Sequence, residues 1–161
     1  MLIVSNTSPL SNLAIIGELS LLQSVYPKIL IPSIVEAELM RLPEIQPIIS
    51  NQIASGWLEV QVPTDLQLLQ ALSQSLDPGE AAAIALAIEL NADRLLIDEK
   101  LGRRIASEYG LKIRGIVGVL VNAKTKGLVP AVQPILDRLI EQAGFRISQS
   151  LYDRILQESG E

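Results

Sequence analysis

The sequence contains neither cysteine nor histidine. Without cysteine there can be no disulfide framework, no thiolate nucleophile and no zinc ribbon. Without histidine, both a Ser-His-Asp hydrolase and an HExxH metalloprotease are excluded. The groups left for catalysis are therefore carboxylates, lysine, tyrosine and hydroxyls, with or without a hard metal ion.

Phosphate-binding loops are also absent, and aromatic residues are few. The chain has no GxxxxGK[ST] or GxGxxG motif, so it lacks a phosphate loop. Its few aromatic residues are scattered and cannot form a base-stacking platform. They are Tyr26, Trp57, Tyr109, Phe145 and Tyr152. A bound nucleic acid would have to be held mainly through its backbone.

No apolar run approaches the roughly 18 to 20 residues that span a bilayer. The N-terminus, Met1–Asn6, lacks the basic and apolar stretches of a signal peptide. We therefore expect a soluble, cytoplasmic protein with no membrane partner. A length of 161 residues with 48% apolar content suits a single domain over residues 1–161.

Charge is unevenly distributed along the chain. The net charge is −5, yet residues 94–126 hold eight basic and three acidic residues, a net of +5. The remainder therefore carries −10. Such a segment is either a phosphate-contacting surface or a set of ordinary solvated helix faces.

Short apolar runs alternate with helical patterns. We expect strands at 2–4, 28–31, 57–60, 95–97 and 112–114. Helices are expected from Ser8–Pro9 to Gly17 and over 34–42, 79–90 and 99–109, with another starting near Gly115. Residues 43–47 are expected to break the chain between helices, and 131–161 to form a helical C-terminal extension with a stop at Gly144. This alternation predicts an α/β fold of three αβα layers with a central, mostly parallel sheet.

Two polar residues follow strands directly. Asn6 comes after the first predicted strand and Asp98 after the fourth. In open α/β sheets, ligands bind beyond the carboxyl ends of the strands. Each residue also has a structural interpretation: Asn6 as a turn residue that bonds nearby backbone, and Asp98 as the N-cap of the helix beginning at Glu99.

Two glutamates face inward on their helices. Glu38 lies in the middle of an apolar face, and Glu80 shares a stripe with Ile84. A buried pair with Arg103 is the structural alternative for Glu38, and a capping box with Asp77 is the alternative for Glu80. Clustered carboxylates repel one another unless a cation neutralises them, and oxygen ligands select Mg²⁺ or Mn²⁺. The joint arrangement therefore predicts a metal site.

With these residues in place, the sequence resembles the PIN-domain family, in a prokaryotic PIN-like branch of uncharacterised function related to toxin-antitoxin ribonucleases. The resemblance covers nearly the whole chain. The matching stretches are residues 4–10, 31–39, 79–87, 95–104 and 144–148, the last together with 151–152.

The resemblance implies a PIN-like fold and metal-dependent cleavage of RNA by a toxin that a small antitoxin protein silences. The family's four acidic positions match Asn6, Glu38, Glu80 and Asp98. Glu99 is a further candidate ligand, and Thr7 and Ser8 match hydroxyls that brace the first position. The basic side chains expected along the RNA backbone are Lys100, Arg103, Arg104, Lys112 and Arg114.

Asn6 departs from the family pattern, which has aspartate there. An amide oxygen can bind a hard cation but removes one negative charge. The alternative function is therefore a catalytically impaired PIN-like module that binds RNA or a partner protein. A doubly wound phospho-acceptor domain using Asp98 is a weaker reading, because Asn6 and Thr7 stand where that site needs paired acids.

A homodimer is also expected. The short helix holding Leu19, Leu21, Leu22 and Val25 either presents an apolar stripe to a second copy or an antitoxin helix, or packs on the sheet.

Overall fold

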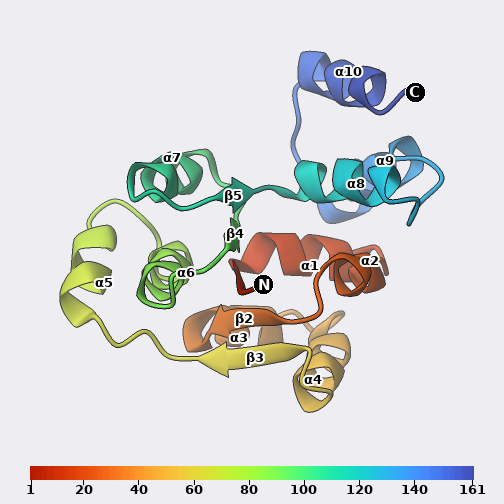
Figure 1. Ribbon diagram of the computed structural model, residues 1–161. Helices are drawn as coiled ribbons and strands as arrows, with labels where there is room; N and C mark the ends of the chain where they lie inside the picture. Colours follow the sequence, from red (N-terminus) through yellow and green to blue (C-terminus); the bar gives the residue numbers. More distant parts are fainter.

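The computed structural model describes residues 1–161 and has one sheet of five parallel strands at its centre (Figure 1). The strand order is β3-β2-β1-β4-β5. The strands are β1 (Ile3–Ser5), β2 (Ile29–Pro32), β3 (Leu58–Gln61), β4 (Arg94–Leu96) and β5 (Ile113–Arg114). All four neighbouring pairs are parallel. The three-layer α/β fold predicted from the sequence is confirmed.

Ten helices surround the sheet. They are α1 (Thr7–Ile15), α2 (Leu19–Val25), α3 (Ser33–Met40), α4 (Gln46–Ala54), α5 (Leu66–Leu72), α6 (Pro78–Glu89), α7 (Lys100–Glu108), α8 (Ile116–Thr125), α9 (Gln133–Ala143) and α10 (Gln149–Glu158). The sequence implied α4 only as the helix after the break at 43–47, without bounds, and it did not predict α5. None of the helices is long and apolar enough to cross a membrane.

Alternate strand residues supply the two cores. Val4, Leu30 and Leu95 belong to a buried cluster with α6, on one face of the sheet. Ile3 and Leu96 belong to a larger cluster with residues of α1, α2, α8 and α9. Because successive side chains of a strand point to opposite faces, three-residue strands buried on both sides read as continuous apolar runs.

Two prolines lie in the first turns of helices that begin earlier than the sequence suggested. The first helix starts at Thr7 with Asn6 as its N-cap, two residues before the predicted proline start at Pro9. Pro47, expected within a break, lies in the first turn of α4. Proline fits anywhere in a first turn, because the backbone N–H groups there have no helical acceptor.

The short helix α2 packs in the core. Leu19, Leu21 and Leu22 are all at most 5% exposed, and Val25 packs against the same cluster. Of the two arrangements that the sequence allowed, the structure has the packed one. The expectation of an apolar stripe for a second copy or an antitoxin helix is therefore wrong for α2.

The C-terminal extension consists of two helices joined by residues 144–148. Gly144 ends α9 in the left-handed region, with φ 69°, as the predicted stop. Figure 1 shows α10 above α8 and α9. The Ser148 side chain caps α10 by accepting from Leu151 N, and Tyr152 Oη donates to Asp137 Oδ1.

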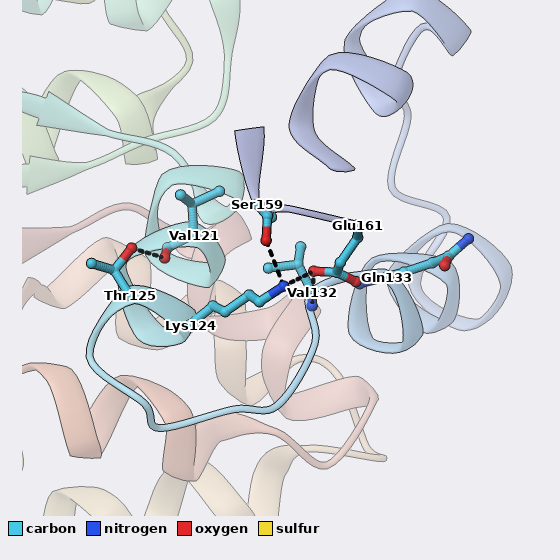
Figure 2. Close-up of polar contacts among 7 residues, drawn as sticks. All are labelled: Val121, Lys124, Thr125, Val132, Gln133, Ser159 and Glu161. Atoms are coloured by element: carbon cyan, nitrogen blue, oxygen red, sulfur yellow. Dashed lines mark hydrogen bonds and ion pairs between the residues drawn. The ribbon is translucent and has the colours of Figure 1, made fainter. Parts of the chain in front are cut away.

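Glu161 fastens the end of the chain to two helices (Figure 2). Its carboxylate accepts from Val132 N at 2.8 Å and from Gln133 N at 3.0 Å, at the start of α9. Lys124 Nζ of α8 lies 2.9 Å from Glu161 Oε2. Burial acts to raise the pKa of Glu161, but these hydrogen bonds and the lysine outweigh it and lower that pKa.

We predict that Glu161→Gln lowers the free energy of unfolding at pH 7 by about 1 kcal/mol, because it removes the charge from these hydrogen bonds. The loss is no larger because solvent partly screens that charge. The lowered pKa means that this stabilisation is present above pH 4.5, the usual value, and is lost at lower pH. Urea unfolding at pH 7 and pH 3 measures both. Glu158→Gln, which removes an exposed ion pair of 3.8 Å, is the matched control. Equal losses of unfolding free energy in the two variants would contradict the stabilising role of Glu161 at the start of α9.

Candidate functional site

The central strand β1 places two predicted site residues side by side. It lies between β2 and β4, so the strand order reverses there, and Ser5 pairs with Leu96 in register. Asn6 N donates to Leu96 O at 3.0 Å. Asn6 and Asp98 therefore leave the carboxyl edge of the sheet from neighbouring strands, at the position where α/β proteins bind ligands.

The Asn6 side chain is held by no hydrogen bond within the chain. The residue is 4% exposed and occupies the N-cap of α1, yet its amide makes no capping bond. The interpretation of Asn6 as a turn residue that bonds nearby backbone through its side chain does not hold. Its amide oxygen is left without a partner in the chain.

Glu38 of α3 is held by the first turn of α1. Thr7 Oγ1 donates to Glu38 Oε2. The Thr7 hydroxyl thus braces Glu38 rather than Asn6, and the Ser8 hydroxyl has no such contact. The sequence alternative of a buried pair between Glu38 and Arg103 is wrong, because Glu38 forms no ion pair.

Glu80 lies in the first turn of α6 and is 8% exposed. The predicted cap is present: Asp77 Oδ1 accepts from Glu80 N at 2.9 Å. Burial, then hydrogen bonding to Asp77, then the charges of Asp77, Glu99 and Glu38 raise the pKa of Glu80 to about 8. Asp77 therefore does the capping, while Glu80 faces the other acids.

Asp98 connects β4 to α8. Its Oδ1 accepts from Ile116 N, the first residue of α8, at 2.8 Å. The alternative interpretation of Asp98, as the N-cap of the following helix, is wrong, since Glu99 occupies the N-cap of α7. Asp98 Oδ2 is buried with no hydrogen-bond partner. Burial raises the pKa of Asp98, against the Ile116 N–H and the Arg103 charge, which lower it, while the Glu99 charge adds to the rise.

Three glycines allow these carboxylates their positions. A methyl group at Gly79 would lie 2.7 Å from Glu38 Oε1, and one at Gly115 would lie 2.8 Å from Asp98 Oδ1. At Gly102 it would lie 3.1 Å from Glu80 Oε2. Sequence reasoning gave these glycines no part in the site. Each of these glycines lies close to its acid in space, and the order of residues along the sequence does not show which acid that is.

The predicted basic stretch divides into two groups. Lys100, Arg103 and Arg114 line a pocket of about 590 Å³ that also includes Asp98. Arg104 instead pairs with Glu108 on the exposed side of α7, and Lys112 lines a different pocket, beside Tyr109 and Gly110. Neither Arg104 nor Lys112 thus lies with the other three.

The pocket also has two basic residues that sequence reasoning missed. Arg146 follows α9 and Arg154 lies on α10. Along the sequence they are more than thirty residues from Lys100, Arg103 and Arg114, so no local pattern could have joined them to these three.

The chemistry of the acidic residues suits a hard cation, although no three acidic side chains are grouped closely enough to hold one in this arrangement. All the candidate donors are oxygen atoms, as Mg²⁺ and Mn²⁺ prefer. Two costs would be relieved by a positive charge: the unpartnered Asp98 Oδ2 and the unfavourable ionisation of Glu80. The donor set fits such an ion.

We predict that Glu80→Gln stabilises the metal-free protein at pH 8 by about 2 kcal/mol or more. The folded protein holds the Glu80 proton up to about pH 8 and the unfolded chain only to 4.5, so stability falls as pH rises between these values. Urea unfolding in chelator at pH 5 and pH 8 measures this. The exposed Glu44→Gln is the control. If the stability of Glu80→Gln fell between pH 5 and pH 8 by as much as that of the native protein, the raised pKa of Glu80 would be contradicted.

Comparison with known proteins agrees with this fold. A family model for a PIN domain of uncharacterised function matches residues 2–161. A search of the curated proteins found no match. PIN domains are in general nucleases that use divalent metal ions and act on RNA. Since the match spans almost the whole chain, this protein belongs to the PIN-domain family.

Proposed function

We propose that the protein is a metal-dependent endoribonuclease. The observation that carries this is the position of Asp98. It lies at the carboxyl edge of β1 and β4, next to the strand that precedes Asn6, and it also lines a pocket with five basic residues. Acids that hold a cation beside bases that hold phosphates are what phosphodiester hydrolysis needs.

In this proposal Glu38, Glu80 and Asp98 hold Mg²⁺ or Mn²⁺, with the Asn6 amide as a weaker ligand and Glu99 as a further one. An ion held there would act as a Lewis acid, able to polarise the phosphate and to lower the pKa of an attacking water. Thr7 keeps the Glu38 carboxylate oriented through its hydroxyl. Lys100, Arg103 and Arg114 hold the RNA backbone beside Asp98.

The biological role proposed is that of a toxin silenced by a small antitoxin protein. This role is supported by the resemblance to the PIN-domain branch related to toxin-antitoxin ribonucleases. No homodimer is proposed, since α2 is in the core.

The second candidate is a PIN-like module that binds RNA or a partner protein without cutting. Asn6 favours it, because an amide contributes no negative charge where the family pattern has aspartate. The cleavage assay and the Asn6 variant separate the two candidates.

We expect cleavage of single-stranded RNA that requires Mn²⁺ or Mg²⁺ and falls about a hundredfold or more in Asp98→Asn. The variant keeps an oxygen for the Ile116 N–H but loses the charge. Asp93→Asn is the matched control, because Asp93 lies at the opposite end of β4, where it accepts from Leu2 N. Gel assays with and without chelator measure the rates. An inactive native protein that still binds RNA would establish the second candidate.

We expect Asn6→Asp to tighten Mn²⁺ binding by about tenfold or more, since it adds a full charge at a ligand position. The same charge should lower the melting temperature in chelator, where nothing offsets its repulsion of the other acids. Calorimetric titration and thermal melts measure the two effects. Asn51→Asp, an exposed change on α4, should alter neither. Unchanged Mn²⁺ affinity in Asn6→Asp would show that Asn6 faces away from the ion.

A further inference from the structure

The pocket beside Asp98 is built from parts of the chain that are distant in sequence. Elements α7, β5 and the start of α8 form one wall, and residues 145–154 form the other. We call it the arginine pocket. Its basic residues are Lys100, Arg103, Arg114, Arg146 and Arg154, and its apolar residues are Ile113, Val117, Phe145, Ile147 and Leu151.

Positive charge in this pocket is largely uncompensated. Asp98 is its one acidic residue, so the lining carries a surplus of four charges on a chain whose net charge is −5. The single ion pair among these bases joins Arg154 to Glu158 at 3.8 Å, and both side chains are mostly exposed. Arg114 donates to Tyr26 Oη, a neutral group. An anion would meet several cations with free donors.

The lining also specifies the kind of anion. Arginine forks suit phosphate oxygens, and the half-buried Phe145 and its apolar neighbours offer a surface for a flat ring. A volume of about 590 Å³ lies within the range of small-ligand sites, roughly 300 to 1,000 Å³. These properties together match one nucleotide.

The location connects the pocket to the acids. Asp98, Phe145 and Arg146 also line a second, smaller pocket of about 330 Å³ that includes Ser8 and Glu99. Residues 145 and 146 therefore lie between the two spaces. A strand passing from one to the other would cross Asp98.

We propose that the arginine pocket seats one nucleotide of an RNA strand, next to the phosphate that is cut, and that Arg146 and Arg154 contact its phosphate oxygens. This inference rests on the proposed ribonuclease function and adds to it a subsite to which the C-terminal extension contributes. The contacts of Glu161 with Val132, Gln133 and Lys124 then act to position this extension, since they hold the segment after α10 against α8 and α9.

The test measures binding without cleavage. A fluorescent single-stranded hexaribonucleotide is titrated with the full chain in chelator, and anisotropy is followed at several salt concentrations. We expect Arg146→Gln and Arg154→Gln each to weaken binding about five- to twentyfold. The salt slope should fall by about 0.7 for each arginine lost, as expected for a phosphate contact on single strands. A merely structural role for these arginines would not change the slope.

Two further arginine variants serve as comparisons. Arg94→Gln changes the amino end of β4, at the opposite edge of the sheet, and should leave binding unchanged. Arg104→Gln removes a charge from α7 outside the pocket and should weaken binding less than twofold. Losses in Arg104→Gln as large as those in the pocket variants would show diffuse attraction and overturn the subsite.

The remaining outcomes separate the subsite from the nuclease. If the hexaribonucleotide binds in an arginine-dependent way but is not cleaved in Mn²⁺, the subsite is supported and the nuclease function is ruled out. Cleavage with an unchanged KM in the Arg146→Gln, Arg154→Gln double variant supports the nuclease and removes the subsite. Tight binding of an acidic decapeptide or of inorganic phosphate, with none of the hexaribonucleotide, would also overturn the proposal. Melting temperatures of all variants exclude unfolding as the cause.

Discussion

The parallel pairing of β1 with β4 is the contact on which the candidate site depends. About ninety residues separate these strands, and they meet in register, Val4 against Leu95. The pairing brings Asn6 to Asp98, places α6 across both strands, and leaves the carboxyl edge open where the strand order reverses. Because side chains alternate along a strand, a slip of one residue would exchange the two cores.

The burial of Glu80 and Asp98 near this edge opposes folding as long as no cation is bound there. Glu80 ionises only near pH 8, and Asp98 keeps a buried oxygen without a partner. The apolar clusters on either side of the sheet, with side chains such as Ile31, Leu86 and Leu96 fully buried, offset that cost. The apolar layers thus stabilise the fold while the carboxyl edge destabilises it, as is common where a site must bind charge.

The sequence predicted the fold well, because strands buried on both faces are short, continuous apolar runs. It also indicated that Glu80 faces inward, since the helical spacing of Glu80 and Ile84 is a local property. Local patterns gave less about partners. Thr7 bonds Glu38, and Asp98 bonds Ile116 rather than the helix that follows it. These contacts depend on how α1, α3 and α8 pack, which no sequence window contains.

The carboxylate of Asp98 lines both the arginine pocket and the smaller pocket beside Ser8 and Glu99, and it also accepts a hydrogen bond from Ile116 N. One Asp98 oxygen fixes the start of α8, whose neighbours Gly115 and Val117 line the arginine pocket, and the other oxygen has no partner. A reorientation of Asp98 would therefore break the hydrogen bond that holds the first turn of α8. Ligands on the two sides of Asp98 would share this one carboxylate, and linkage requires any coupling between them to be equal in both directions.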